Sequence, residues 1–329
     1  EIRALYIDKK QRIWTGSRDM NVSIYDARLR LLKRMKWGKV YAIMQDSAGV
    51  YWILTKGQGL IKAIETSQGN FKLQHFKHKA DDPYSLSNDN IYFTFQDSRQ
   101  RLWVATYGGG LNLIETMPDG TLRFINHRNL LKRYPISHFY KVRHITEDNQ
   151  GRIWVSTTAG ILQFKVSFHC PEEIDFHSIC REQGNVNSLS NNDVIYTFES
   201  KKGEIYIITH SSGLNLVTSK NLLCDNIEFV HLNKQNGLPS DMAYTMIEGN
   251  RNELWISFED QICRYNPDRG SIESYNRFYF HSHLLVSEIP LVRDDKNGMY
   301  VALNRDVLYL HLDKLNKSSF IPHIVFTNA

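Results

Sequence analysis

A short aromatic motif recurs along the whole chain and constrains its fold more than any other feature. The fullest copy, at residues 97–111, reads DSRQRLWVATYGGGL, and related copies occupy residues 46–60 and 148–161. The aromatic residue of each copy is Trp14, Trp52, Trp103, Trp154, Tyr206, Trp255 or Tyr300. Successive positions are 38, 51, 51, 52, 49 and 45 residues apart. Seven copies at a period near 50 residues indicate a repeat architecture.

Each repeat is predicted to contain four short antiparallel strands. Six residues before the aromatic residue stands an Asp in most copies, including Asp46, Asp97 and Asp148. An Asp that hydrogen-bonds its own turn, followed by a residue tolerant of positive φ, predicts a tight hairpin. A second turn is predicted where Gly108, Gly109 and Gly110 follow the strand. Apolar segments flank both turns, and no helical period of 3.6 residues is present.

The strand that carries the aromatic residue is apolar on both faces. Leu102 and Val104 form one alternating set, and Trp103 and Ala105 form the other. Such a strand is expected between two packed neighbours, because a sheet with one wet face would alternate apolar and polar residues. The chain is therefore predicted to be all-β, a seven-bladed β-propeller of four-stranded antiparallel blades with the aromatic residues packed between them.

The repeats also predict the boundaries of the blades. The propeller is expected to span residues 1–319, with blades near 1–39, 40–80, 90–130, 141–180, 193–233, 242–281 and 288–319. The tail at 320–329 is interpreted as the outer strand of the last blade or the first strand of a further domain. The chain enters a strand directly after Glu1, so it is interpreted as a piece of a longer protein.

Composition excludes several classes of function. The chain has 40 basic and 35 acidic residues, a net charge of +5, and no basic block, so nucleic acid is not expected as a partner. No apolar run approaches the length of a membrane span, and no signal peptide is recognisable. Nucleophile-elbow, zinc-protease and phosphate-loop motifs are also missing from the sequence, so no catalytic residue and no cofactor is predicted.

Four cysteines are too few for a disulfide framework. Cys170 and Cys180 bracket nine residues of the insertion at 167–187, which permits a disulfide that would pin this loop. Unpaired thiols and a metal site remain alternatives for this segment. The nearby residues with metal-ligand chemistry are His169, Glu172, Glu173 and His177. Their spacing fits no tight ligand motif, so no metal is predicted.

One face of the predicted disc carries the variable loop residues. In a four-stranded blade, the turn between strands two and three shares a face with the connection that enters strand one. Specificity usually resides in such loops. The candidate ligand-binding residues are Arg18, Lys56, Tyr107, His138, Tyr140, Asn192, His210, Asp241, Glu259 and Arg305. Their aromatic, amide and charged groups suit a sugar, and the cationic positions favour an acidic glycan. Asp46, Asp97, Asp148 and Gly108, Gly109 and Gly110 are interpreted as structural turn residues.

The combined motif resembles the two-component regulator propeller repeat. Its parts are Ser-Leu-Ser-Asn at 85–88, an apolar strand, Asp-x-x-Gly-x-x-Trp-x-x-Thr, and a Gly-rich turn ending in Leu. The resemblance implies the periplasmic sensor domain of a Bacteroides-type hybrid two-component system, which recognises oligosaccharides from glycan breakdown and signals to a histidine kinase. It also implies a non-catalytic domain whose partners are the other receptor domains, including an immunoglobulin-like domain that the tail would begin. A homodimer of the full-length receptor is compatible with it.

Two other classes of function remain open at this stage. A propeller can bind a protein partner without any small ligand, or it can be a glycosidase or lyase. Sialidases also carry Asp and Trp turn repeats, but there the Trp stands five positions after the Asp, whereas here it stands six positions after it. The chemistry of the central cavity discriminates: paired carboxylates about 5–10 Å apart favour hydrolysis, an aromatic and polar groove favours a sugar, and a broad apolar patch favours a protein.

Overall fold

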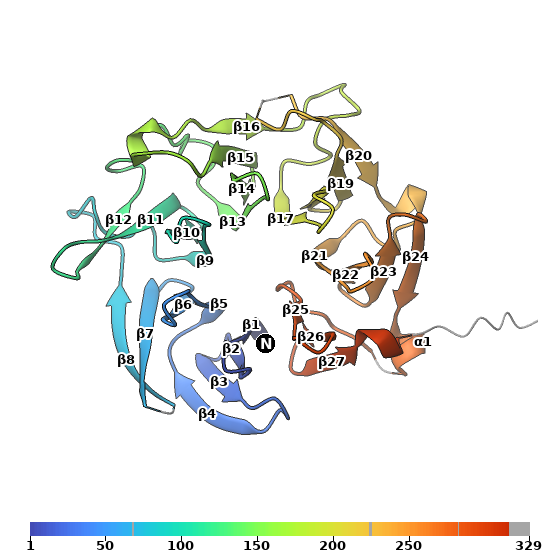
Figure 1. The fold of residues 1–329 in the computed structure, drawn as a ribbon, viewed down its shortest axis with the longest axis horizontal. Helices are drawn as coiled ribbons and strands as arrows, with labels where there is room; N and C mark the ends of the chain where they lie inside the picture. Colours follow the sequence, from blue (N-terminus) through green and yellow to red (C-terminus); the bar gives the residue numbers. More distant parts are fainter. Residues whose placement is uncertain (68, 224–225, 282, 316–329) are drawn as a thin grey trace, which may run out of the picture.

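The computed structural model describes residues 1–67, 69–223, 226–281 and 283–315. Seven antiparallel sheets stand around a central axis like the blades of a propeller (Figure 1). This confirms the predicted fold. Within the described residues the seventh sheet has three strands, and each of the other six has four. The predicted tail strand at 320–329 lies outside the described residues.

The first four blades follow one another around the ring. Blade 1 contains β1 (Ile2–Ile7), β2 (Ile13–Ser17), β3 (Asn21–Tyr25) and β4 (Leu31–Lys36). Blade 2 contains β5 (Val40–Gln45), β6 (Tyr51–Thr55), β7 (Leu60–Ser67) and β8 (Asn70–Phe76). Blade 3 contains β9 (Ile91–Gln96), β10 (Leu102–Thr106), β11 (Gly110–Thr116) and β12 (Leu122–Ile125). Blade 4 contains β13 (Val142–Glu147), β14 (Arg152–Thr157), β15 (Gly160–Lys165) and β16 (His177–Ile179).

The remaining three blades complete the ring. Blade 5 contains β17 (Val194–Glu199), β18 (Ile205–Thr209), β19 (Gly213–Val217) and β20 (Phe229–Leu232). Blade 6 contains β21 (Ala243–Glu248), β22 (Leu254–Phe258), β23 (Ile262–Asn266) and β24 (Ser271–Tyr275). Blade 7 contains β25 (Val292–Arg293), β26 (Gly298–Ala302) and β27 (Val307–His311). The described helical turns are η1 (Pro171–Glu173), η2 (Lys234–Asn236), α1 (Arg277–Phe280) and η3 (Leu312–Lys314).

Each blade is a meander whose first strand lies innermost (Figure 1). The repeated aromatic residues fill the space between blades, as predicted. Trp103 is completely buried and packs against Phe164 of blade 4, with ring centroids 5.1 Å apart. Trp14 stacks on Tyr51 of blade 2 at 4.5 Å. Because both faces of each blade are covered by a neighbour, the apolar residues on both faces of the second strand become core.

The hairpin Asp explains the fixed spacing of six residues to the Trp. In blade 3, Asp97 Oδ1 accepts hydrogen bonds from the backbone N–H groups of Arg99 and Arg101. Its Oδ2 accepts from Trp103 Nε1 at 2.9 Å and from Arg101 Nε at 2.8 Å. One carboxylate therefore closes the turn and satisfies the buried indole. Asp8 and Asp148 make the same four bonds, so these turns are structural.

The Leu-containing connections are anchored in the core. Leu86, Leu189 and Leu238 are at most 3% exposed. In blade 3, Ser87 N donates to Asn112 Oδ1 and Asn112 Nδ2 donates to Ser87 Oγ, at 2.9 and 2.7 Å. The reciprocal pair fixes the connection against the third strand of its own blade.

A second repeated contact joins neighbouring blades on the hairpin face. The last residue of an inner strand accepts a hydrogen bond from the backbone N–H that follows the hairpin Asp, or its equivalent, in the preceding blade. The acceptors, here called the clasp residues, are Gln45, Gln96, Glu147, Glu199 and Glu248, and the bonds measure 2.6–3.0 Å. Between blades 6 and 7 the direction reverses, because Arg293 donates to Asn250 Oδ1 at 2.7 Å.

The ring closes by packing of blade 1 against blade 7, without a shared sheet. Leu5 and Ile13 of blade 1 pack with Ile289, Tyr300 and Ala302. One backbone bond, from Ile2 N to Asn304 O at 3.0 Å, crosses the junction. Ile7 occupies the clasp position of blade 1 and has no side-chain acceptor, so this junction lacks the bond that joins the other blades.

The cysteine prediction needs correction. Among the described residues, the structure forms no disulfide between Cys170 and Cys180. The physical reason is the pairing of β16 with β15, which carries Cys180 to the Gly160 turn. There its Sγ lies 3.4 Å from the carbonyl oxygen of Ala159, whereas Cys170 precedes η1.

Candidate functional site

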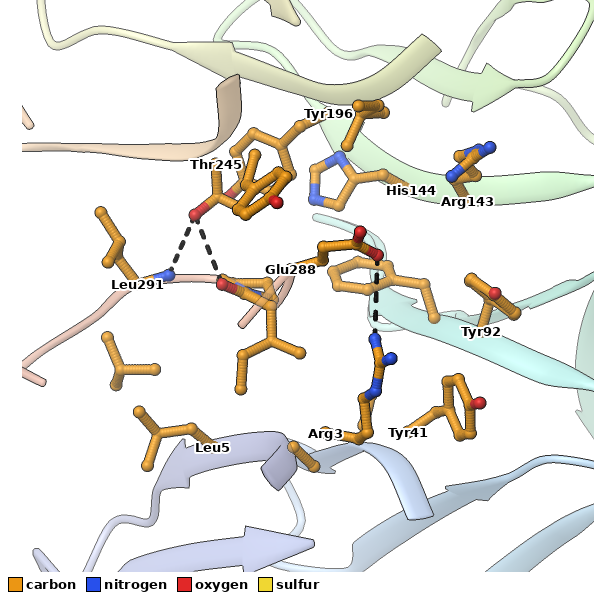
Figure 2. Close-up of a pocket in the computed structure, with 18 of the residues that line it drawn as sticks. Arg3, Leu5, Tyr41, Tyr92, Arg143, His144, Tyr196, Thr245, Glu288 and Leu291 are labelled. Atoms are coloured by element: carbon orange, nitrogen blue, oxygen red, sulfur yellow. Dashed lines mark hydrogen bonds and ion pairs between the residues drawn. The ribbon is translucent and has the colours of Figure 1, made fainter. Parts of the chain in front are cut away.

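A cavity of about 530 Å³ lies on the propeller axis, enclosed by the inner strands of the blades. It is lined from β1, β5, β9, β13, β17 and β21, and from the segment 288–293 that leads into β25. Figure 2 shows two unlike walls, with Leu5 and Leu291 on one side and Arg3, Tyr41, Tyr92 and Arg143 on the other. The size suits a small ligand.

A β-bulge repeated in six inner strands places one side chain per blade in this cavity. In β9, Ile91 pairs with Thr106 and Phe93 with Ala105, which leaves Tyr92 as the extra residue. β1, β5, β13 and β17 have the same irregularity after their first residue, and in β21 the irregularity is longer, because pairing resumes only at Met246. Bulges re-aim side chains near functional sites. The extra residues, here called the bulge ring, are Arg3, Tyr41, Tyr92, Arg143, Ile195 and Tyr244, and all six line the cavity.

Three tyrosines form an arc on the polar wall. The ring centroids of Tyr41 and Tyr92 are 5.6 Å apart, and Tyr92 stacks on Tyr107 at 4.9 Å. Lys56 lies 5.7 Å from the Tyr41 ring and Lys141 lies 5.2 Å from the Tyr107 ring. Half-buried aromatic faces beside cations form a surface on which a polar ring can stack.

Two arginines flank the tyrosine arc. Arg3 pairs with Glu1 and lies 6.0 Å from the Tyr41 ring. Arg143 pairs with Asp193 at 2.9 Å. Burial and the neighbouring Tyr41 raise the pKa of Tyr92, while the positive charges of Arg143 and Arg3 act in the opposite sense. Both guanidinium groups are therefore within electrostatic reach of the Tyr92 phenol, at the centre of the arc.

Glu288 is the carboxylate that lines the cavity among the described residues. Its Oε2 lies 3.7 Å from Arg3 Nη1, a contact drawn in Figure 2, and its side chain is 61% exposed. The backbone around it is held in place. Ser287 N donates to Ala302 O at 2.8 Å, and Thr245 Oγ1 donates to Ile289 O at 3.4 Å. A solvent-exposed carboxylate on a hydrogen-bonded backbone segment thus faces Arg3.

His144 is buried deeper in the cavity wall, between two aromatic rings. Its ring centroid lies 4.4 Å from Phe93 and 4.1 Å from Tyr196. Burial lowers the pKa of His144 to about 3, so the imidazole is neutral at physiological pH. Thr197 N donates to Nδ1 at 3.5 Å, which assigns the proton to Nε2. His144 can therefore donate a hydrogen bond but carries no charge.

Two further phenols keep their protons in the cavity. Burial raises the pKa of Tyr196 to about 12. The pKa of Tyr244 is also raised to about 12, mainly by burial and further by the nearby charges of Glu259 and Glu288. Neutral phenols at these positions can donate or accept hydrogen bonds without a change of charge.

The loop residues predicted from the sequence do gather on one face. Gly108 N and Gly110 N both donate to Tyr140 O at 2.9 Å, which joins the Gly-rich turn of blade 3 to the connection into blade 4. Only part of the set reaches the cavity. His210 lines it, Tyr107 stacks on its wall, Lys56 lies over Tyr41, and Lys141 lies 5.4 Å from the ring of Tyr140.

The other predicted site residues have local partners or lie at the rim. Asn192 and Asp241 cap backbone N–H groups of Arg181 and Lys234, at 2.6 and 2.7 Å. Arg18 pairs with Glu1 at 2.8 Å, and His138 Nδ1 lies 2.9 Å from Ser137 Oγ. Glu259 and Arg305 are exposed.

The sequence analysis missed the bulge ring. Its residues stand at the second position of each inner strand, directly after Ile2, Val40, Ile91, Val142, Val194 or Ala243. Aligning the repeats on the hairpin shows that this position varies from Arg to Tyr to Ile while the preceding residue stays apolar. That contrast was the available signal. The alternation of a regular strand does not predict that these side chains point toward the axis, because that direction depends on the bulge.

Comparison with known proteins supports the assignment of the repeats. The family model described as two component regulator propeller matches residues 85–108 and 139–159. A histidine kinase, P4, from Formosa agariphila is 26% identical over 249 residues, which are 73% of this chain and 17% of that protein. The chain thus spans about a sixth of the length of this relative.

Solved structures of propellers share the fold. The extracellular domain of a hybrid two component system from B. thetaiotaomicron has a TM-score of 0.59 and 16% identity, covering 96% of this chain and 48% of that one. A virginiamycin B lyase from Staphylococcus aureus has a TM-score of 0.65 and 13% identity, covering 94% and 93%. At these identities the likeness shows the fold alone.

Fold and site together define a seven-bladed propeller with a ligand-sized axial cavity. The match of the two component regulator propeller model to residues 85–108 and 139–159 agrees with the resemblance seen in the sequence. In fold, the chain is similar to the extracellular domain of the hybrid two component system from B. thetaiotaomicron. No helix among the described residues is long and apolar enough to cross a membrane.

Proposed function

We propose that this chain is the ligand-binding sensor propeller of a hybrid two-component receptor, located on the periplasmic side of the membrane, and that it recognises oligosaccharides. Its partners are then the other domains of the receptor, including a histidine kinase. The two-component regulator repeats and the histidine kinase relative support the receptor assignment. The axial cavity supports a small ligand.

The observation that carries the sugar proposal is the chemistry of the cavity wall. Tyr41, Tyr92 and Tyr107 offer aromatic faces, and Arg3 and Arg143 offer charged donors beside them. Sugar sites combine stacking on an aromatic face with hydrogen bonds to hydroxyl groups. Among the competing functions, a broad apolar patch for a protein partner fits this wall less well.

Hydrolysis fits the cavity poorly. A glycosidase of the usual kind needs two carboxyl groups about 5–10 Å apart. Glu288 is the single carboxylate lining the cavity within the described part of the chain. Ligand binding without turnover is therefore the proposed role, and the binding energy would shift the receptor between two arrangements that bind the ligand unequally.

The test is a thermal-shift and calorimetric screen of the propeller against neutral and acidic oligosaccharides. We expect binding without turnover, and we expect Tyr92→Ala to weaken it about tenfold, since stacking on an aromatic face contributes on the order of 1 kcal/mol. Ala replacements of Tyr107 and His210, at the cavity, and of Arg305, at the rim, show which of the two regions the ligand contacts. Failure of every oligosaccharide to bind, or turnover abolished by one point mutation, contradicts the proposal.

A further inference from the structure

The two arginines of the bulge ring each have N–H donors that no described residue accepts. A guanidinium group carries five N–H donors. Arg3 pairs with Glu1, and its contact to Glu288 is loose at 3.7 Å. Arg143 pairs with Asp193 through Nη2. Nε of each arginine is buried and has no hydrogen-bond partner among the described residues. Leaving a buried donor without a partner costs free energy, so both guanidinium groups favour a ligand oxygen that carries negative charge and can accept their hydrogen bonds.

The two arginines lie on either side of the Tyr41–Tyr92 pair. Around the axis, blades 1 to 4 contribute Arg3, Tyr41, Tyr92 and Arg143 from equivalent bulge positions. Blades 5 and 6 contribute Ile195 and Tyr244 at the same positions, which bring no charge. The positive charge of the bulge ring is thus confined to one arc, on both sides of the Tyr41–Tyr92 pair (Figure 2).

A carboxylate of the protein itself already faces this arc. Glu288 reaches Arg3 across the cavity from the segment before β25 (Figure 2). The distance of 3.7 Å and the 61% exposure of the Glu288 side chain indicate a weak, solvated ion pair. A stronger bidentate partner can displace it, because an arginine binds a carboxylate or sulfate through two parallel hydrogen bonds.

We propose that the Arg3–Arg143 arc binds a sugar that carries a carboxylate or sulfate group, with the sugar ring against Tyr92, and that Glu288 is the internal competitor which this acid displaces. The inference rests on the proposed function and adds the ligand class and the residues that select it. It assigns specificity to inner-strand residues that sequence analysis of the loops did not identify.

The experiment compares three probes on one ring scaffold: glucuronate, glucose 6-sulfate and glucose. Affinities are measured by calorimetry or NMR titration, with sodium chloride keeping the ionic strength equal. We expect the wild-type propeller to bind at least one acidic probe about tenfold more tightly than glucose, as one charge-assisted hydrogen-bonded pair would give. The two acidic probes distinguish a carboxylate from a sulfate. Equal affinity for all three probes would overturn the inference.

Four variants test where the acid group of the bound probe lies. Arg3→Met and Arg143→Met should each remove most of the preference for the acidic probe and leave glucose affinity nearly unchanged. Glu288→Gln should strengthen acid binding several-fold, a gain that a purely structural role of Glu288 would not produce. Arg133→Met, which replaces an exposed arginine outside the cavity lining, is the matched control and should change nothing. An acid preference that survives both Arg3→Met and Arg143→Met contradicts the assignment.

Two safeguards keep the result interpretable. Arg143→Met leaves Asp193 without its partner, so Arg143→Lys provides a second variant that keeps the charge but loses the bidentate fork. Melting curves establish that each variant is folded. If neutral oligosaccharides bind against Tyr92 without any preference for an acid, the proposed sensor function stands and this inference fails. If no sugar binds, both fail.

Discussion

At the scale of single residues, the hairpin carboxylate determines whether the buried indole N–H of each blade has a hydrogen-bond acceptor. Trp103 and Trp154 each donate to the Asp that stands six residues earlier. In blade 6, Gly249 occupies that position, and the carboxylate of Glu253 accepts from Arg251 N instead, at 2.7 Å. Trp255 Nε1 is left buried without a partner among the described residues. The repeats are thus alike in backbone but unequal in hydrogen bonding.

This inequality predicts different costs for one substitution. Trp103→Phe removes the hydrogen bond to Asp97, whereas Trp255→Phe removes only indole volume. We expect Trp103→Phe to lower the free energy of unfolding by about 1.5–3 kcal/mol more than Trp255→Phe, the usual net contribution of a hydrogen bond to a charged acceptor. Urea unfolding of both variants measures the difference. Equal costs would show that the Asp97–indole bond contributes nothing to stability.

His144 predicts a pH dependence of stability. Burial lowers the pKa of His144 to about 3 in the folded state, against an ordinary value of 6.5. The unfolded chain therefore binds the extra proton first, and this contribution to stability is lost as the pH falls from about 6.5 toward 3. Between pH 7 and pH 5 the loss is about 2 kcal/mol.

The matched variants are His144→Phe and His75→Phe, the second of which replaces an exposed histidine on β8. Phenylalanine suits the position between Phe93 and Tyr196. His144→Phe should remove about 2 kcal/mol of the pH dependence of unfolding between pH 7 and 5, and His75→Phe should leave it unchanged. Unchanged pH dependence in His144→Phe would mean that His144 is not the buried titrating group.

At the scale of elements, strands and turns were predictable from the sequence, but the site was not. The period of the Trp residues and the Asp-x-x-Gly turns gave the hairpins, because those patterns are local. The bulge at Tyr92 depends on how β9 pairs with β10. The alternation of apolar and polar residues along either strand does not predict that register. The Gly-rich turns and the connections between blades do lie side by side, while the cavity wall came from strands.

The clasp residues make a prediction about contacts between elements. Gln96, Glu147 and Glu199 each accept a backbone N–H of the preceding blade. Replacing all three by Ala should lower the free energy of unfolding by roughly 3 kcal/mol, because each bond contributes about 1 kcal/mol and each clasp residue has its own backbone donor. The control replaces three exposed glutamates elsewhere: Glu173, Glu228 and Glu259. Equal losses in the two triple variants would exclude a specific role for the clasps.

At the scale of the whole molecule, the junction of blades 1 and 7 is held by apolar packing and differs from the other junctions. It lacks a clasp residue, because Ile7 stands where the other blades have Gln, Glu or Arg293. The sequence revealed seven blades but not this closure, because ring closure depends on contacts between residues some 300 positions apart, such as Ile2 and Asn304. We expect the junction to open before the rest of the ring.

Hydrogen exchange detects such an opening. Under mild denaturant, the amides of β1 and β26 should exchange at a lower opening free energy than those of β9, β10 and β14, which lie in blades with clasps on both sides. Exchange of all blades at one common free energy would contradict this and would show a single cooperative unit.

The most direct test of the account is a crystal structure of the propeller with an oligosaccharide identified by the binding screen. The account predicts sugar density in the axial cavity, with one ring against Tyr92 and, for an acidic sugar, its acid group between Arg3 and Arg143 in place of the Glu288 carboxylate. Density confined to the rim near Glu259 and Arg305, or to the hairpin face of the disc, would contradict it.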